Sequence, residues 1–321
     1  MEEQKKTKKI KWWIPVIVGM SWAVVMAGCC FIIYSRKAYE LQQNVYFLEW
    51  DTKEDETIFY KYSSKDEGAV EVGKVEGQMN HCVINDEESC ITGLCYDQGV
   101  KRVQYDLITG TVYSEVIGEK IDLLTGDVTW YALLMYDGGN KIVISYEEAN
   151  GDEKWLFYDF TSEEYNMIEG QGSTTEFLEI DDNNLWYVSS AGRLYRYNFE
   201  SGRKTEMLKN IGNAAVAVNT NLVAYIKDSM HPKKIYWYNL NTKKTRFIAK
   251  GGWNICYGNI FEKKGQWSND GRKFFYVKYF PTFFSAADVS LMVYNTENGR
   301  TFCIYKEKNT LHQFRYIGHS G

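Results

Sequence analysis

A short aromatic pattern recurs along the chain and constrains its fold more than any other feature. An aromatic residue followed by Asp or Asn begins a polar turn at five places, namely Tyr105-Asp106, Tyr158-Asp159, Tyr197-Asn198, Tyr238-Asn239 and Tyr294-Asn295. These tyrosines are 53, 39, 41 and 56 residues apart. A period near 40 residues that holds about four short strands is typical of propeller blades. The pattern therefore predicts a β-propeller, with loop insertions where the spacing is longer.

The segments between these pairs alternate as strands do. One unit contains alternating runs at 175–180, 185–190, 193–198 and 204–208, separated by the turn-like sequences DDNN, AG and FESG. The stretch KKIYWYNLNTKKTRFI, Lys233 to Ile248, is predicted to form the last two strands of the next unit. Aromatic residues make up 16% of the chain, which favours strands because flat side chains pack well on a pleated sheet.

The number of units indicates how the ring closes. Five complete units fall between about Gln78 and Lys306, and a partial one at 45–75 is one strand short. The segment HQFRYIG, at 312–318, can supply the missing strand, and a closed ring removes open sheet edges. We therefore predict an all-β fold, a six-bladed β-propeller of four-stranded antiparallel blades at residues 44–321, closed by a C-terminal strand. Seven blades are the alternative.

The N-terminal segment differs from everything after it. Residues 12–34 carry no charge, and 23 residues in a helix can cross roughly 30 Å of hydrocarbon. Five lysines precede this run, which indicates that the N-terminus stays inside the cell. We expect a cytoplasmic basic tail at 1–11, a transmembrane helix (signal anchor) at 12–34 and a linker at 35–43. The expected location is the cell membrane, single-pass, with the propeller outside.

The sequence VMAGCC, Val25 to Cys30, leaves a second possibility open. A basic start, an apolar run and a small-residue-Cys ending resemble a lipoprotein signal, in which Cys29 would be acylated and become the mature N-terminus. Against this, the apolar run continues through Phe31 to Tyr34, where a polar tether is expected. Both possibilities place the propeller on the outer side of the membrane.

Charge limits the possible partners. Residues 1–37 hold seven Lys/Arg and two Asp/Glu, which leaves 30 basic against 40 acidic residues in the rest of the chain, a formal charge of −10. A domain of that sign repels phosphate backbones, so we expect no nucleic acid partner.

The residue types of catalytic and metal sites are scattered. The four histidines form no i,i+4 pair, and the cysteines show no CxxC spacing, so we expect no catalytic residues, no metal and no cofactor. Cys82 and Cys90 flank a turn-like NDEE, and a cross-strand disulfide there is possible, although small apolar core residues are the favoured interpretation.

One segment carries a family resemblance. QWSNDGRKFFYV, Gln266 to Val277, is similar to the W-S-P-D-G-[KR] repeat of TolB-like six-bladed propellers, in the wider WD40-like superfamily, with Asn269 in place of Pro. The motif covers one blade, and the other blades share only the hairpin pattern and spacing. The resemblance implies a propeller that serves as an interaction platform, commonly at bacterial envelopes.

Two long segments entering and crossing the last blade predict a binding surface. The loops expected at 251–265 and 279–288 emerge on the same face of a propeller and both contain large aromatic residues. Clustered aromatics on loops indicate either a contact surface or a small satellite core. The candidate binding residues are Trp253, Tyr257, Phe280, Phe283 and Phe284.

These observations predict a non-enzymatic module that binds or scaffolds a protein or peptide of the bacterial cell envelope. The alternative is an enzyme, a lyase or hydrolase acting on envelope glycans or peptides through the central channel. A sensor is a third possibility, weakened by a cytoplasmic tail of only about 11 residues.

Overall fold

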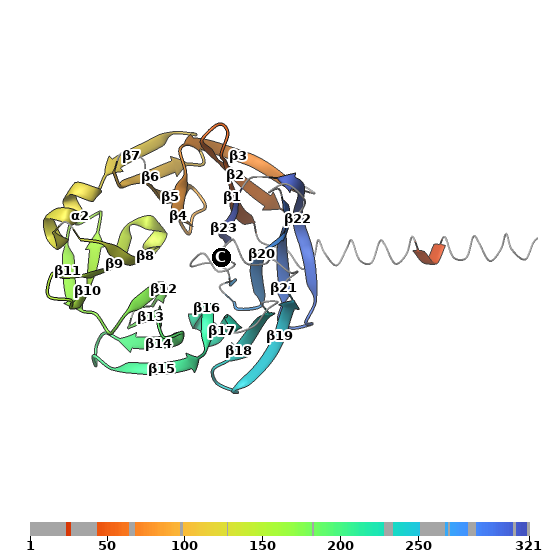
Figure 1. Cartoon of the computed structure of the whole chain (residues 1–321). Helices are drawn as coiled ribbons and strands as arrows, with labels where there is room; N and C mark the ends of the chain where they lie inside the picture. The colour runs from red at the N-terminus through yellow and green to blue at the C-terminus, as the bar shows by residue number, and fades with distance from the viewer. Residues whose placement is uncertain are drawn as a thin grey trace, which may run out of the picture.

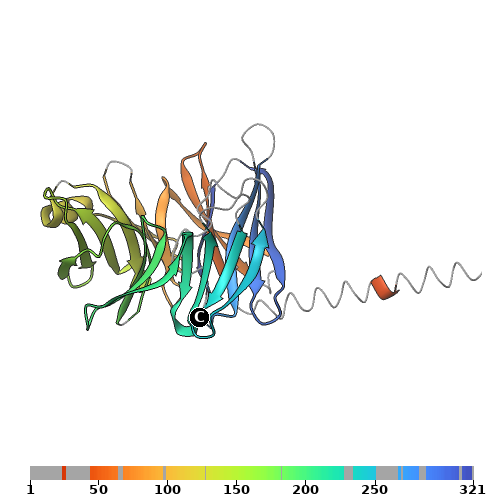
Figure 2. The ribbon, with the colours of Figure 1, turned by 60° about the horizontal axis from the view of Figure 1, so that its bottom comes forward.

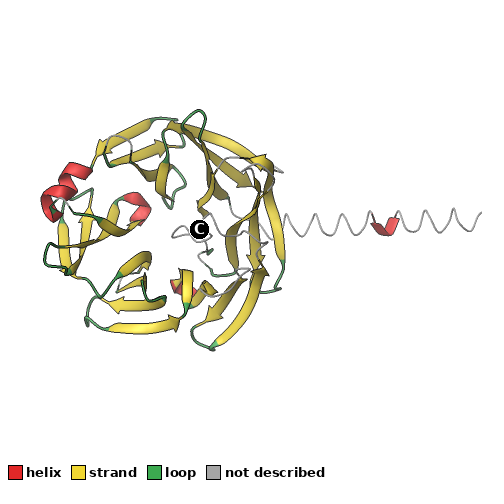
Figure 3. Ribbon diagram, viewed as in Figure 1, coloured by secondary structure: helices red, strands yellow, loops and turns green. Residues whose placement is uncertain are grey.

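The computed structural model describes residues 24–26, 44–63, 68–96, 99–126, 128–181, 183–227, 234–250, 267–268, 270–281, 287–310 and 313–319. Six small antiparallel sheets surround a central space (Figure 1), and nearly all of the regular structure is strand (Figure 3). The chain is thus an all-β, six-bladed propeller. Turning the view shows the strands running between the two faces of the ring (Figure 2).

The first three blades contain the N-terminal strands. Blade 1 comprises β1 (Val45–Asp51), β2 (Glu56–Ser63), β3 (Gly68–Glu76) and the last strand of the chain, β23 (Gln313–His319). Blade 2 comprises β4 (Met79–Ile84), β5 (Cys90–Cys95), β6 (Lys101–Asp106) and β7 (Val112–Val116). Blade 3 comprises β8 (Trp130–Tyr136), β9 (Lys141–Glu147), β10 (Glu153–Asp159) and β11 (Tyr165–Glu169).

The other three blades follow in chain order. Blade 4 comprises β12 (Thr174–Ile180), β13 (Asn184–Ser189), β14 (Arg193–Asn198) and β15 (Lys204–Lys209). Blade 5 comprises β16 (Ile211–Ala217), β17 (Leu222–Lys227), β18 (Lys234–Asn239) and β19 (Lys244–Lys250). Blade 6 comprises β20 (Lys273–Pro281), β21 (Ala287–Asn295) and β22 (Thr301–Thr310) within the described residues, and Trp267 bridges to Phe274 ahead of them.

The two ends of the propeller meet in blade 1. β23 pairs antiparallel with β1, from Val45 opposite His319 to Trp50 opposite Gln313. The β23 label lies beside the central space in Figure 1. The sequence HQFRYIG therefore supplies the strand that the first unit lacks.

The hydrophobic core consists of six clusters, one at each junction between neighbouring blades. The cluster between blades 3 and 4, for example, packs Trp155 and Val143 against Phe177 and Tyr187. The cluster between blades 6 and 1 packs Phe275 and its neighbours against β1 and β2. Each blade therefore buries apolar surface on both of its faces, because no sheet has a core of its own.

The recurring Asp or Asn caps a turn. We call the connection between the first and second strands of a blade its inner turn, and the connection between the third and fourth strands its outer turn. In five outer turns the side-chain oxygen of the Asp or Asn accepts a hydrogen bond from a backbone N–H two or three residues later. The accepting residues are Asp106, Asp159, Asn198, Asn239 and Asn295. The residue five positions after each tyrosine has a left-handed φ between 57° and 71°, at Gly110, Glu163, Gly202, Lys243 and Gly299.

The inner and outer turns of a blade are joined at one face of the ring. In blades 2 to 6, the residue after the Asp or Asn donates its N–H to an inner-turn carbonyl at 2.8–2.9 Å, in the pairs Leu107 to Ser89, Phe160 to Asn140, Phe199 to Asn183, Leu240 to Asn221 and Thr296 to Arg272. The repeated dipeptide is therefore a structural device that closes each hairpin and fixes it to its blade.

The recurring tyrosine joins neighbouring blades. Tyr105 donates to the carbonyl of Val72 in blade 1 at 3.3 Å, and it packs so closely that a Cβ on Gly73 would lie 2.0 Å from its hydroxyl. Tyr294 accepts a hydrogen bond from the indole of Trp237 in blade 5 at 3.2 Å. The sequence pattern thus marks both the hairpin and the contact with the preceding blade.

Two connections differ from the sequence expectation. The 53-residue spacing between the first two repeats includes a helix that was not predicted, α2 (Gly118–Thr125), which buries Ile121 between blades 2 and 3. The loop predicted at 279–288 is shorter than expected, because β20 and β21 pair out to Pro281 opposite Ala287, so residues 279–281 and 287–288 belong to strands. The aromatic run at the end of β20 extends the ladder instead of leaving it.

The N-terminal and cysteine predictions have different outcomes. Within the described residues no helix is long and apolar enough to cross a membrane. The predicted span at 12–34 lies outside those residues except for the helical turn 24–26, so it stays a prediction. No disulfide joins Cys82 and Cys90, so the possible cross-strand bridge is not formed. Burial raises the pKa of the Cys90 thiol.

Candidate functional site: a groove between blades 3 and 4

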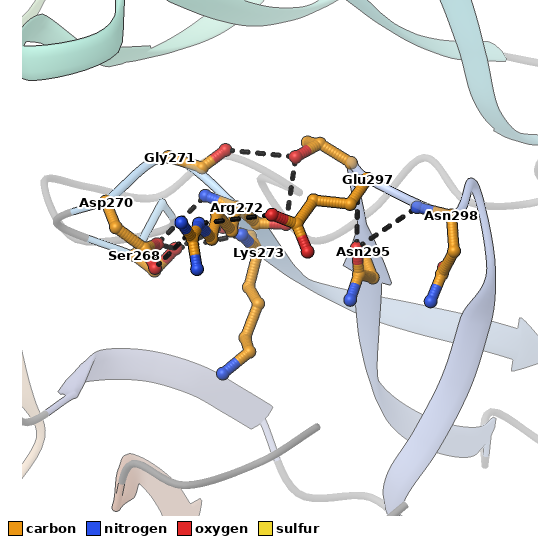
Figure 4. Close-up of polar contacts among 9 residues, drawn as sticks. Ser268, Asp270, Gly271, Arg272, Lys273, Asn295, Glu297 and Asn298 are labelled. Carbon is orange, nitrogen blue, oxygen red and sulfur yellow. Dashed lines mark hydrogen bonds and ion pairs between the residues drawn. The ribbon is translucent and has the colours of Figure 1, made fainter. Parts of the chain in front are cut away.

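The segment with the family resemblance forms the inner turn of blade 6 (Figure 4). The Ser268 hydroxyl accepts a hydrogen bond from the N–H of Lys273 at 2.8 Å and lies 2.6 Å from Asp270 Oδ1. Gly271 has φ 64°, and a Cβ there would lie 2.1 Å from the Thr220 hydroxyl in blade 5. Only glycine fits this position without displacing its neighbour.

The same turn is tied to the surrounding blades. The indole of Trp267 donates to the carbonyl of Ala215 in blade 5 at 3.0 Å. Arg272 pairs with Glu297 of the outer turn at 3.2 Å (Figure 4). The conspicuous polar residues of this motif are thus engaged in holding blade 6 in place, so the motif marks the fold and does not by itself mark a ligand site.

A groove opens between blades 3 and 4 at the face that carries the inner and outer turns. Its volume is about 600 Å³, and it is lined by Tyr136, Asp137, Lys141, Phe157, Asn166, Ile168, Ile180, Asp181 and Phe199. Blade 3 contributes the end of β8, the inner turn, the start of β9, β10 and β11. Blade 4 contributes the end of β12, the residue after it and the residue after β14. Concave apolar sites with a few polar groups are typical of ligand binding.

Strand alternation places aromatic side chains in the groove. Trp155 and Phe157 lie two residues apart on β10 and face blade 4 together, with Trp155 fully buried and Phe157 half-buried nearer the turns. The Phe157 and Phe199 rings are 5.6 Å apart at an interplanar angle of 83°. The edge-to-face arrangement is a favourable one for two aromatic rings. Phe157 and Phe199 therefore give the groove lining an apolar part.

Charged residues line the rim on the blade 3 side. Lys141 lies 3.1 Å from Asp137 and 3.8 Å from Asp159. The hydrogen bond to Asp137 raises the pKa of Lys141, so the ammonium group stays charged at neutral pH. Burial alone would raise the pKa of Asp159, but N–H donors from its turn and the nearby Lys141 outweigh it and lower the pKa. Lys141 and Asp159 therefore both remain ionised at pH 7.

Two further polar groups complete the rim. Asp181 receives three hydrogen bonds on Oδ1, from the N–H groups of Asn183 and Asn184 and the Asn184 side chain, at 2.7–3.0 Å. Burial and the nearby Asp159 and Asp137 raise the pKa of Tyr136 to about 12, so its phenol is neutral. Among the residues that line the groove, Asp137 and Asp181 against Lys141 give a formal charge of −1, and Asp159, which is not a lining residue, lies 3.8 Å from Lys141. The groove can therefore accept an apolar or cationic side chain.

Most of the residues predicted as the binding site fall outside the described part of the chain. Trp253, Tyr257, Phe283 and Phe284 are outside the described residues. Phe280 lies in β20, opposite Asp288 of β21, instead of in a loop. The role assigned to these five residues stays a prediction.

Sequence reasoning missed the groove. Tyr136 and Phe157 come from β8 and β10 of blade 3, and Phe199 follows β14 of blade 4, so Phe199 joins the other two only through packing between blades. One signal was present, because an aromatic residue follows the Asp or Asn of the repeat only at Phe160 and Phe199, whereas Leu or Thr follows it in the other three repeats. These two blades therefore carry an extra ring at the turn face.

No protein-family model matches the chain, and no curated protein matches it significantly. Solved structures do resemble it. TolB from Acinetobacter baumannii has a TM-score of 0.58 at 13% identity, over 87% of this chain and 66% of that one. A putative TolB from Agrobacterium tumefaciens has a TM-score of 0.55 at 10% identity, over 86% and 99%. A chain of a nidogen/laminin complex has a TM-score of 0.51 at 6% identity, over 86% and 97%.

These similarities describe the fold. The chain is a six-bladed β-propeller that is structurally similar to TolB and to other propellers at low sequence identity.

Proposed function

We propose that this propeller is a binding module for a protein or peptide of the cell envelope and that the partner docks in the groove between blades 3 and 4. The observation that carries the proposal is the groove itself, a concave site of about 600 Å³ with half-buried aromatic residues and a charged rim. Half-exposed aromatic anchors beside polar groups are the features that dominate binding energy at protein interfaces. The similar fold in a nidogen/laminin complex is consistent with such a use.

A binding role also suits the chemistry of the lining. None of the described residues that line the groove is Ser, Thr, Cys or His. Asp and Lys can also act as acids or bases, but Asp137 is paired with Lys141 and Asp181 accepts N–H hydrogen bonds from its own turn. Elsewhere in the described residues no group of three or more His, Cys, Asp or Glu could hold a metal ion. We therefore propose recognition without a chemical step.

The proposed location follows from the sequence. The uncharged run at 12–34 behind a lysine-rich tail supports an anchor in the cell membrane with the propeller outside. Protease added to intact protoplasts should digest the propeller and spare the N-terminal tail. Resistance of the propeller until the cells are lysed would contradict this location.

The docking site is tested by filling it. Asn166 is exposed, lines the groove and lies opposite Phe157 in the β10 and β11 ladder, so the substitution Asn166→Trp places an indole in the opening. We expect this variant to lose the partner that is recovered with wild-type protein by crosslinking in intact cells. The matched control is Ile108→Trp, at a residue 80% exposed on the outer turn of blade 2. Equal recovery by both variants would place the binding surface elsewhere.

A further inference from the structure

An arginine of the chain itself shows what the turn face of a blade junction can bind. Arg102 on β6 is 9% exposed and crosses from blade 2 to blade 3. Its Nε donates to the carbonyl of Gly139 at 2.9 Å, and Nη2 donates to Asn140 Oδ1 at 3.2 Å. The guanidinium carbon lies 4.8 Å from the centre of the Phe160 ring. The junction thus combines an aromatic ring with acceptors from an inner turn.

The next junction repeats this framework without the arginine. Phe199 occupies the same repeat position as Phe160, and both donate their N–H to the corresponding asparagine of the inner turn, Asn183 or Asn140. The Phe160 ring meets Tyr158 edge-on at 5.2 Å, and the Phe199 ring meets Tyr197 edge-on at 5.9 Å. The two rings are therefore held in matching surroundings.

The residue that corresponds to Arg102 explains why the second junction is open. Arg102 precedes the tyrosine of its repeat by three residues, and the residue at that position in blade 3 is Trp155. The Trp155 indole N–H donates to Glu153 at 3.0 Å and to the Thr174 hydroxyl at 3.2 Å, at the opposite end of β12 from the groove. Among the described residues, no arginine or lysine lies over the ring of Phe157 or Phe199.

We infer that the groove between blades 3 and 4 binds an arginine side chain of the partner, which takes the place that Arg102 takes between blades 2 and 3. This inference rests on the proposed function and specifies the partner as a peptide segment with an arginine beside an apolar residue. The guanidinium group lies against Phe199 and donates to the carboxylate of Asp181, whose Oδ2 receives none of the three turn hydrogen bonds. The formal charge of −1 on the groove lining, with Asp159 beside Lys141, favours a cation.

Arginine suits this site better than lysine. A guanidinium group is planar, stacks on aromatic rings and presents several donors in a fixed geometry, whereas an ammonium group is compact and strongly hydrated. The Arg102 site uses both properties, since one group contacts a ring and donates to two different acceptors. The Phe157 ring and Ile168 then contact the apolar residue next to the arginine.

The test uses three peptides and the full-length protein. Ac-Leu-Arg-Phe-NH2 is titrated by calorimetry and by ligand-observed NMR, beside the same peptide with lysine or with uncharged citrulline. We expect the arginine peptide to bind about tenfold or more tightly than the citrulline peptide, because charged hydrogen bonds are lost with citrulline. Equal affinity of the arginine and citrulline peptides, within about twofold, would overturn the inference.

Two variants locate the site. Asp181→Asn keeps the Oδ1 acceptor that holds the turn and removes the charge, so it should reduce the preference for arginine over citrulline while leaving the thermal midpoint unchanged within a few degrees. Asn166→Arg offers the groove an arginine from the chain and should weaken arginine-peptide binding in the same way. Undiminished arginine preference in both variants would place any arginine site elsewhere and refute the inference.

The outcomes separate the two proposals. If Asn166→Trp loses the cellular partner but the peptides show no preference for arginine, the groove remains the docking site and the arginine inference is refuted. If the arginine preference depends on Asp181 but Asn166→Trp recovers the partner normally, the arginine site is supported. The proposal that this partner docks in the groove between blades 3 and 4 is then refuted.

Discussion

Glu153 joins the two blades that form the groove, and replacing it gives a sharp test of how they are held. It lies at the start of β10, half-buried, and Oε1 accepts hydrogen bonds from Ser145 Oγ at 2.7 Å, the Trp155 indole at 3.0 Å and the N–H of Thr174 at 3.1 Å. Oε2 accepts from the N–H of Gly172 at 2.9 Å. Two of these four donors belong to the chain entering blade 4.

The substitution Glu153→Gln keeps the first oxygen and turns the second into a donor that faces the N–H of Gly172. Hydrogen bonds to a charged acceptor contribute about 1.5–3 kcal/mol, against about 0.5–1.5 for neutral pairs. Weakening three bonds and losing the fourth should lower the free energy of unfolding by about 3 kcal/mol, less than the simple sum because the bonds share one network. Urea unfolding at pH 7 measures this loss. Glu148→Gln, on the exposed turn before β10, should change stability by less than about 0.5 kcal/mol.

The pH dependence of the Glu153 contribution gives a second test. Burial raises the pKa of Glu153, but hydrogen bonds from Thr174, Ser145 and Trp155 outweigh burial and lower it below the ordinary value for glutamate. The unfolded chain then binds the proton more readily, so the contribution is present above the unfolded pKa of about 4.3 and is lost as pH falls through the folded pKa. The difference between wild type and Glu153→Gln should therefore shrink on acidification. A loss below about 0.5 kcal/mol at pH 7, or one that does not change with pH, would refute this account.

Three further predictions concern the repeat and the closure of the ring. Gly73→Ala should lower the free energy of unfolding by about 1–3 kcal/mol, because the new Cβ meets the Tyr105 hydroxyl. Gly68→Ala, with open space around it, should not, and equal thermal midpoints of the two variants would contradict this packing. Lys243→Gly should raise the free energy of unfolding by about 0.5 kcal/mol and Gly299→Ala should lower it by about 1 kcal/mol, because both positions have a left-handed φ near 60°. Changes of the opposite sign in urea unfolding would refute the turn assignment. Deleting 311–321 removes β23 and should cost several kcal/mol of a total of about 5–15, so an unchanged midpoint would show that β23 does not stabilise blade 1.

The blade hairpins were predictable because their determinants are local. An Asp or Asn that caps its own turn, and a residue four positions later that must adopt a left-handed φ, are both visible in the sequence around Tyr197 and Tyr294. The strand at 313–319 was predictable by a different route, since the first unit lacked one strand. Period and turn chemistry therefore predict the six blades and their order.

The groove and the helix were not predictable in this way. Phe157 and Phe199 are ordinary strand and turn residues, and their contact depends on the angle and spacing between two blades. α2 is short, it begins at Ile117 without a side-chain cap, and its only buried residues are Gly118 and Ile121, so it shows little helical periodicity. A helix that forms by filling a gap between sheets is stabilised by tertiary packing, which a single sequence does not display.

The most direct measurement of the central claim is site-specific photocrosslinking in intact cells. A photoreactive phenylalanine analogue is placed at position 166 in the groove, at position 108 on the exposed turn of blade 2 and at position 253 in the segment predicted from sequence. A docking site between blades 3 and 4 predicts one discrete adduct from position 166, none from 108, and suppression of that adduct by Ac-Leu-Arg-Phe-NH2 but not by its citrulline form. An adduct from position 253 with none from 166 would contradict the claim and would favour the aromatic binding surface that was predicted from the sequence.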